Sequence, residues 1–163
     1  ETGSGPMSLN VLCNSSQLFS KTSQIPLIRP DQALKVNSTA AAPALGDPLG
    51  WLFTHSNLSS RAYALEVSGN SMQPVFQEGD WIILDPMAVP EPGDFVVAKC
   101  GEKKELIFRK YRPKGLDNSG KMTFELVPLN EDFPSLRSDI LPIEIIGTLI
   151  EHRIFTKKHL IAS

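Results

Sequence analysis

The sequence predicts a mainly β domain made of short strands, preceded by an irregular N-terminal arm. From residue 51 onward, short runs rich in β-branched and aromatic residues recur, and turn-forming residues separate them. No long stretch shows the period of an amphipathic helix. The 11 glycines and 13 prolines favour many turns. Hydrophobic residues make up 41% of the chain, which is enough for one compact core.

Each strand is expected where a β-rich run lies between two turn signals. The expected strands lie near 62–67, 81–84, 95–99, 106–112, 124–128 and 143–151, with a last one at 160–161. Turns are marked by Asp85-Pro86, by Pro92-Gly93-Asp94 and by residues 115–120. One helical turn is expected at 72–77. The run 143–150 is strongly apolar, which is typical of a core strand.

Three parts follow along the chain. Residues 1–6, ETGSGP, are interpreted as an expression scar. Residues 7–50 are interpreted as a linker arm, because Ser, Asn, Ala and Pro dominate and 38–44 has the composition of a tether. One apolar patch in the arm, 25–28, is expected to dock on the sheet as a short edge strand. The domain itself is expected at 51–163.

The charge balance argues against direct contact with nucleic acid. The chain has 16 basic and 18 acidic residues, a net charge of −2, whereas a domain that grips phosphates normally carries a basic excess. The basic cluster 109–114 is therefore interpreted as a solvated strand and turn. If DNA is involved, we expect another part of the natural protein to touch it.

Neither a metal nor another cofactor is expected. Cys13 and Cys100 lack a CxxC partner and nearby histidines, and two cysteines define no disulfide framework. A reducing cytoplasm is the simplest compartment for such a chain. No apolar run approaches the ~18 residues that a membrane span needs, so no membrane association is expected.

The functional interpretation depends on one stretch, Val67-Ser68-Gly69-Asn70-Ser71-Met72-Gln73-Pro74, followed by Glu78-Gly79-Asp80 and Pro92-Gly93-Asp94. A strand runs into a glycine that permits close approach of backbone or substrate, and a serine hydroxyl is presented at the strand end. A lone serine in this context is more often a turn residue than a nucleophile. The whole string is more specific than the serine alone.

This string resembles the VxGxSMxP…GD…PGD signature of the LexA, phage-repressor and UmuD-like serine peptidases. The resemblance runs from about Ile25 to the end of the chain. It implies a LexA-like peptidase fold of short, highly bent strands, a Ser–Lys dyad and cleavage of the protein's own linker, with Ser71 in the nucleophile position. It also implies dimerisation through this domain, and a helix-turn-helix domain that precedes it in the natural protein. Signal peptidases share the Ser-Met-x-Pro box but need a membrane anchor, which this sequence lacks.

The lysine of the dyad is displaced in this sequence. The family places it on a later strand in an apolar-Lys-basic-apolar context. Read without gaps, Phe108 is the preceding apolar residue, Arg109 occupies the lysine slot and Lys110 comes one position late. Successive strand side chains point to opposite faces, and arginine stays protonated, so Arg109 could bond Ser71 but not activate it. A β-bulge that re-aims Lys110 toward Ser71 is the open alternative.

The segment that resembles the family's cleavage region also departs from the pattern. Family members usually cleave an Ala-Gly or Cys-Gly bond, but here Leu34 follows Ala33, and no such pair occurs upstream of Ser71. Glycine lets the backbone take close-fitting conformations that a residue with a Cβ resists. We therefore expect Leu34 to hinder cleavage.

Together these features predict the oligomerisation domain of a phage repressor that maintains lysogeny in the cytoplasm of its bacterial host. It is expected to form a homodimer or higher oligomer, to cleave itself poorly and to be regulated by a protein antirepressor. Operator DNA would be bound through the helix-turn-helix domain alone. The alternative is an active self-cleaving peptidase that uses Ser71 and Lys110 and is induced by DNA damage. A Ser–His–Asp triad is disfavoured, because no spacing singles out His55, His152 or His159.

Overall fold

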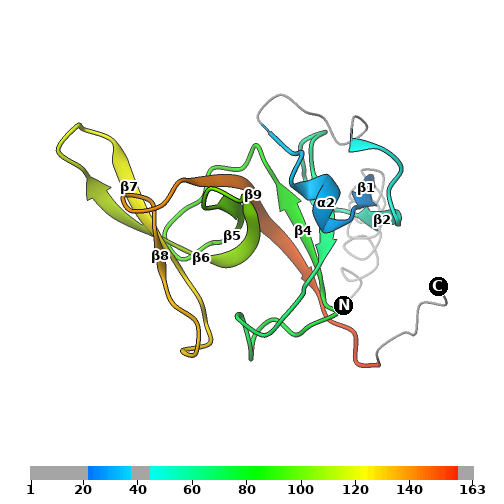
Figure 1. Cartoon of the computed structure of the whole chain (residues 1–163). Helices are drawn as coiled ribbons and strands as arrows, with labels where there is room; N and C mark the ends of the chain where they lie inside the picture. The colour runs from blue at the N-terminus through cyan, green and yellow to red at the C-terminus, as the bar shows by residue number, and fades with distance from the viewer. Residues whose placement is uncertain (1–21, 38–44, 158–163) are drawn as a thin grey trace, which may run out of the picture.

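The protein is described by a computed structural model, which places residues 22–37 and 45–157 (Figure 1). In these residues the chain forms one mixed sheet of nine strands in the order β2-β1-β3-β4-β9-β5-β6-β7-β8, with one short helix, α2. The prediction of a mainly β fold is therefore confirmed. The element bounds are β1 Ser23–Leu27, α2 Pro30–Ala33, β2 Gly50–Thr54, β3 Tyr63–Glu66, β4 Trp81–Asp85, β5 Phe95–Cys100, β6 Glu105–Leu116, β7 Met122–Val127, β8 Leu136–Arg137 and β9 Ile143–Arg153.

Six of the expected strands are present as β3, β4, β5, β6, β7 and β9. The sequence analysis missed β2 and the two-residue β8, and the strand expected at 160–161 lies outside the described residues. The expected helical turn at 72–77 is a hydrogen-bonded turn rather than a helix. Within it the Phe76 amide donates to the Met72 carbonyl at 3.0 Å. No helix of the described residues could span a lipid bilayer.

The prediction that 25–28 forms an edge strand was wrong in one respect. This patch forms β1, but β1 lies between β2 and β3, because β2 pairs antiparallel along its whole length and takes the edge position. The following residues Ile28, Ala33 and Val36 pack into the main hydrophobic core. Part of the expected arm is thus built into the sheet and core.

The centre of the sheet is β9, which lies between β4 and β5. Its register shifts once against β4 and once against β5, and such irregularities bend a strand. The sheet is accordingly strongly curved around β5, β6 and β9 (Figure 1). The main core packs on β3, β4, β5 and β9 and includes Tyr63, Phe76 and Leu84.

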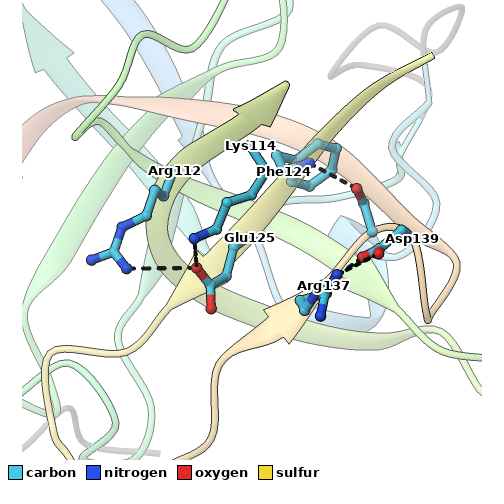
Figure 2. A network of polar contacts seen from close by, with 7 residues as sticks. Arg112, Lys114, Phe124, Glu125, Arg137 and Asp139 are labelled. Carbon is cyan, nitrogen blue, oxygen red and sulfur yellow. Dashed lines mark hydrogen bonds and ion pairs between the residues drawn. The ribbon is translucent and has the colours of Figure 1, made fainter. Parts of the chain in front are cut away.

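The other end of the sheet is a hairpin of β6 and β7 that projects away from α2, β1 and β2 (Figure 1). Glu125 of β7 lies 3.0 Å from the Lys114 amine and 3.5 Å from the Arg112 guanidinium, and Figure 2 shows both cations directed at its carboxylate. Beside them, Arg137 of β8 pairs with Asp139. Two cations of the basic cluster are thus engaged by a carboxylate of their own sheet.

Candidate functional site

Ser71 lies in the turn that joins β3 to β4. After Val67 the chain enters a left-handed conformation at Gly69, whose φ of 77° is readily accessible to glycine. The side chains of Met72 and Phe76 are buried at 2% exposure and anchor the turn in the core. The Ser71 hydroxyl is consequently held at a fixed place beside β6.

A buried carboxylate fixes the far end of this turn. Asp80 is 4% exposed and accepts a hydrogen bond of 3.0 Å from the Gln77 amide. The same carboxylate oxygen lies 2.7 Å from Nε2 of His152 on β9. The Gly79 amide also donates to the Val67 carbonyl at 2.9 Å. The Gly-Asp pair of the motif thus ties the Ser71 turn to the central strand.

The second Gly-Asp pair closes a turn next to β6. Gly93 has a φ of 92°, and its amide donates to the Tyr111 carbonyl at 2.9 Å. Asp94 accepts from the Glu91 amide at 2.8 Å, and the Tyr111 amide donates to the Asp94 carbonyl at 2.7 Å. These contacts tie the turn before β5 to Tyr111 and so help to hold β6 in place.

Arg109 of β6 makes the contact with Ser71. Its Nη1 donates to the Ser71 hydroxyl oxygen at 2.8 Å and to the Phe108 carbonyl at 2.8 Å. Its guanidinium carbon lies 5.9 Å from the centroid of the Phe133 ring. Burial lowers the pKa of Arg109, but a guanidinium remains protonated in proteins and cannot take the proton of a serine. The arrangement orients the hydroxyl without supplying a base.

Lys110 points to the other face of β6. The pairing of β5 with β6 runs without a shift from Phe95 with Lys110 to Cys100 with Glu105. The irregularity in β6 falls later, between Pro113 and Gly115. The structure therefore has no bulge that re-aims Lys110, and the alternation of strand side chains directs it away from Arg109.

Three contacts at the site come from the turn between β7 and β8, and the sequence analysis missed all three. The Asn130 amide donates to the Ser71 carbonyl at 3.0 Å, and the Asn130 side chain donates to the Asn70 carbonyl at 3.1 Å. Phe133 of the same turn covers the guanidinium of Arg109. No local motif around Asn130 signals these contacts, because they depend on how the hairpin folds back.

A cavity of about 490 Å³ opens beside Ser71. Its walls come from the end of β3, the Ser71 turn and the first half of β6, and they include Val67, Leu106 and Phe108. Ser71 and Arg109 both line it. The described residues contain no cluster of His, Cys, Asp and Glu able to hold a metal ion.

The cleavage-like segment is not in this cavity. Ala33 is fully buried in α2, and the amide of Leu34 donates to the Pro30 carbonyl at 3.1 Å. From this segment only Pro30 is among the residues that line the cavity. The structure thus brings Ser71 and Arg109 together and leaves the Ala33–Leu34 bond in a helical turn.

The remaining candidates lie elsewhere. His152 bonds Asp80 rather than Ser71, His55 is exposed, and His159 lies outside the described residues. Cys100 is buried, and burial raises the pKa of its thiol. Cys13 also lies outside the described residues.

Known proteins that resemble this chain include a peptidase family and a transcriptional regulator. A family model described as Peptidase S24-like matches residues 33–150. The chain belongs to the Peptidase S24-like family. The resemblance to LexA-like repressor domains that the serine motif indicated is thereby confirmed. A relative from Coxiella burnetii (strain RSA 493 / Nine Mile phase I), named an uncharacterized HTH-type transcriptional regulator, is 30% identical over 94 residues. The match covers 58% of this chain and 44% of the relative, so the chain spans less than half of that protein.

Proposed function

We propose that this chain is the self-associating domain of a phage transcriptional repressor, that it cleaves itself poorly, and that a protein antirepressor regulates it. The observation that carries the proposal is the hydrogen bond of 2.8 Å from Arg109 to Ser71. In an S24-like site the same position would hold a neutral lysine that removes the serine proton. A guanidinium in that position leaves the hydroxyl protonated and weakly nucleophilic.

The position of the cleavage-like segment supports the same proposal. For the Ala33–Leu34 bond to reach Ser71, α2 would have to unwind and Ala33 would have to leave the core. The Gln32 side chain would also lose its bonds to the carbonyls of Leu45 and Asp47, at 3.1 and 2.9 Å. The nucleophile and the substrate are therefore both in forms that disfavour cleavage.

The role in transcription is supported by the relative and by the charge of the chain. That relative is named an HTH-type transcriptional regulator. A net charge of −2 suits a domain that pairs subunits, while an upstream domain binds operator half-sites. Pairing raises the effective concentration at the second half-site without any added contact to DNA.

Incubation at alkaline pH, followed by intact-mass measurement, tests the catalytic part of the proposal. The unaltered chain is expected to stay intact. Arg109→Lys combined with Leu34→Gly supplies a titratable amine and an Ala-Gly bond, so fragments ending at Ala33 should accumulate faster as pH rises. The matched control is Arg112→Lys with Leu34→Gly, which should stay intact because Arg109 still contacts Ser71, while residue 112 lies beside Glu125.

Two outcomes would contradict the proposal. Prompt cleavage of the unaltered chain after Ala33 would show a working peptidase that uses Lys110. Fragments that form as fast in the Arg112→Lys control as in the Arg109→Lys double variant would show that Arg109 is not the limiting defect. The regulatory part is tested separately by co-purification with candidate phage antirepressors, and failure of all candidates would count against it.

A further inference from the structure

The cavity beside Ser71 is bounded by two open strand edges. In the described sheet, β6 pairs with β7 only from Lys110 onward, so residues 105–109 have a strand partner on the β5 side alone. Across the cavity, β3 pairs with β1 at one register position, Leu27 with Ala64. Unpaired strand edges bind extended peptides through backbone hydrogen bonds. The cavity is thus a groove with the backbone features of a peptide site; we call it the β3–β6 groove.

The lining of the β3–β6 groove suits apolar side chains along most of its length. Val67, Met72, Leu106 and Phe108 contribute to its walls. A volume of about 490 Å³ lies within the range of ligand pockets, roughly 300–1,000 Å³. An extended segment directs alternate side chains to one face, so this lining would contact every second side chain of a bound segment.

Among the described residues, the guanidinium of Arg109 in the β3–β6 groove has no ion-pair partner, although the exposed Glu66 also lines the groove. Its Nε is buried and has no hydrogen-bond partner. Because burial lowers its pKa, the cation is poorly solvated and would gain from an anionic neighbour. The planar guanidinium matches the geometry of a carboxylate.

The described part of this chain does not fill the β3–β6 groove. Segment 29–37 reaches it only through Pro30, while Gln32, Ala33 and Val36 are buried in the fold. An extended occupant taken from this segment would require α2 to unfold. Within the described residues, the groove is therefore open to a second protein.

We propose that the β3–β6 groove binds an extended segment of a second protein and that Arg109 receives a carboxylate of that segment. This proposal rests on the proposed function. It describes the chemistry by which a regulatory partner would recognise the Ser71 site of a domain that cleaves itself poorly. The carboxylate is an acidic side chain or a C-terminus. Either source uses the same guanidinium, and the experiment separates them.

The probes are short fluorescent peptides of alternating Val and Thr, blocked at both ends, with a central Glu or a central Gln. A third probe has the central Gln and a free C-terminal carboxylate. Fluorescence anisotropy with the unaltered chain should give roughly tenfold tighter binding of a carboxylate probe than of the blocked Gln probe. The stronger of the two carboxylate probes identifies the source. Amide shifts in NMR spectra should change at 65–67 and 106–109.

Variants test whether Arg109 is responsible. Arg109→Gln should abolish the preference for a carboxylate, and Arg112→Gln, which removes an exposed arginine of the same strand, should keep it. Arg109→Lys, measured at a pH below the pKa of the introduced amine, retains a cation and should retain most of the preference, which separates loss of charge from loss of folding. Thermal unfolding of each variant checks that the sheet is intact.

The proposal would be overturned by equal affinity for the Glu, Gln and free-acid probes, or by no binding at millimolar peptide. A preference that survives in Arg109→Gln, or shifts that map away from the groove, would also overturn it. Intact mass is measured on the same samples. Cleavage of the unaltered chain after Ala33 would reject the proposed function while leaving the binding result standing, so the two failures are distinguishable.

Discussion

Arg109 and Lys110 are adjacent in β6, yet only one of them reaches Ser71. Arg109 lies opposite Val96 and Lys110 opposite Phe95 in a regular pairing, so their side chains leave the sheet on opposite faces. The Ser71 oxygen accepts a hydrogen bond from a cation that does not give up its proton. An accepted bond of this kind draws electron density from the oxygen, which opposes nucleophilic attack.

At Gly147 of β9 the surrounding atoms leave no room for a larger side chain. A Cβ built there would lie 2.8 Å from the Tyr63 hydroxyl and 2.9 Å from the Leu84 Cβ, both buried atoms. Gly147→Ala is expected to lower the free energy of unfolding by about 1–3 kcal/mol through overpacking. Gly50→Ala, at an open strand position, should change it by less than about 0.5 kcal/mol. Urea unfolding compares the two, and equal stability of both variants would contradict the packing at Gly147.

At the residue scale, the sequence could predict the part of the site that depends on strand alternation. The gapless reading places Arg109 in the lysine slot, and the structure has its guanidinium on Ser71. The supporting contacts could not be predicted in this way. Asn130 bonds Asn70 across 60 positions and His152 bonds Asp80 across 72, so they arise only when the sheet has closed.

Among the elements, β1 and α2 determine whether the cleavage-like segment is available. Gln32 is 1% exposed, and its amide accepts from the Arg29 backbone and donates to the carbonyls of Leu45 and Asp47. These bonds hold the turn in its folded form, and a buried amide lost from such a network leaves its partners unsatisfied.

Gln32→Ala is expected to destabilise the protein by about 1–3 kcal/mol, because both carbonyls lose a buried donor. Gln24→Ala, at an exposed position of β1, is the matched control and should change stability by less than about 0.5 kcal/mol. Chemical denaturation followed by tryptophan fluorescence measures both. Limited proteolysis near residue 34 should also accelerate in Gln32→Ala alone, and equal rates in the two variants would contradict a locking role.

The hairpin of β6 and β7 should carry a pH-dependent part of the stability. The pKa of Glu125 is lowered, first by its bond to Lys114 and further by the charges of Arg112 and Arg137. A lowered folded-state pKa stabilises the protein above the unfolded pKa, and this contribution is lost as pH falls through the folded value. Glu125→Gln should therefore cost about 1 kcal/mol at neutral pH, and the difference from the unaltered chain should vanish in acid.

Thermal unfolding over a pH series checks the Glu125 prediction. Glu102→Gln removes an exposed turn carboxylate and should leave the profile unchanged. A Glu125→Gln deficit that persists at low pH would show that the loss comes from packing rather than from the ion pairs seen in Figure 2.

The elements that the sequence predicts are those with strong local signals. The six β-rich runs between turn residues are strands in the structure. They could be predicted because composition and alternation within each run are visible in the sequence. The position of β1 inside the sheet depends on β2, a strand of five residues whose Trp51 and Phe53 remain exposed. Its burial alternates, but the exposed positions are aromatic and Thr54 is buried, so the sequence shows no matching alternation of apolar and polar residues. The two-residue β8 is too short to show any alternation.

On the scale of the molecule, one curved sheet joins two distinct regions. One region holds α2, β1 and β2, and the β6–β7 hairpin extends away from it (Figure 1). Between them β9 is paired on both edges, so it is available to another subunit only through its faces. Ile150, in this strand, keeps 41% of its surface exposed.

Self-association is the prediction that belongs to this scale. We expect subunit contacts on the faces of the late strand β9, because exposed apolar strand surface is what a partner subunit covers. Sedimentation at micromolar concentration is expected to give a dimer or a larger assembly. Ile150→Glu should shift the equilibrium toward monomer, because a carboxylate buried in an interface without a partner is costly. Val89→Glu, at a loop position that is 84% exposed, should leave the assembly unchanged. A chain that is strictly monomeric would argue against the oligomerisation role itself. An assembly that both variants leave intact would place the contact elsewhere than on β9.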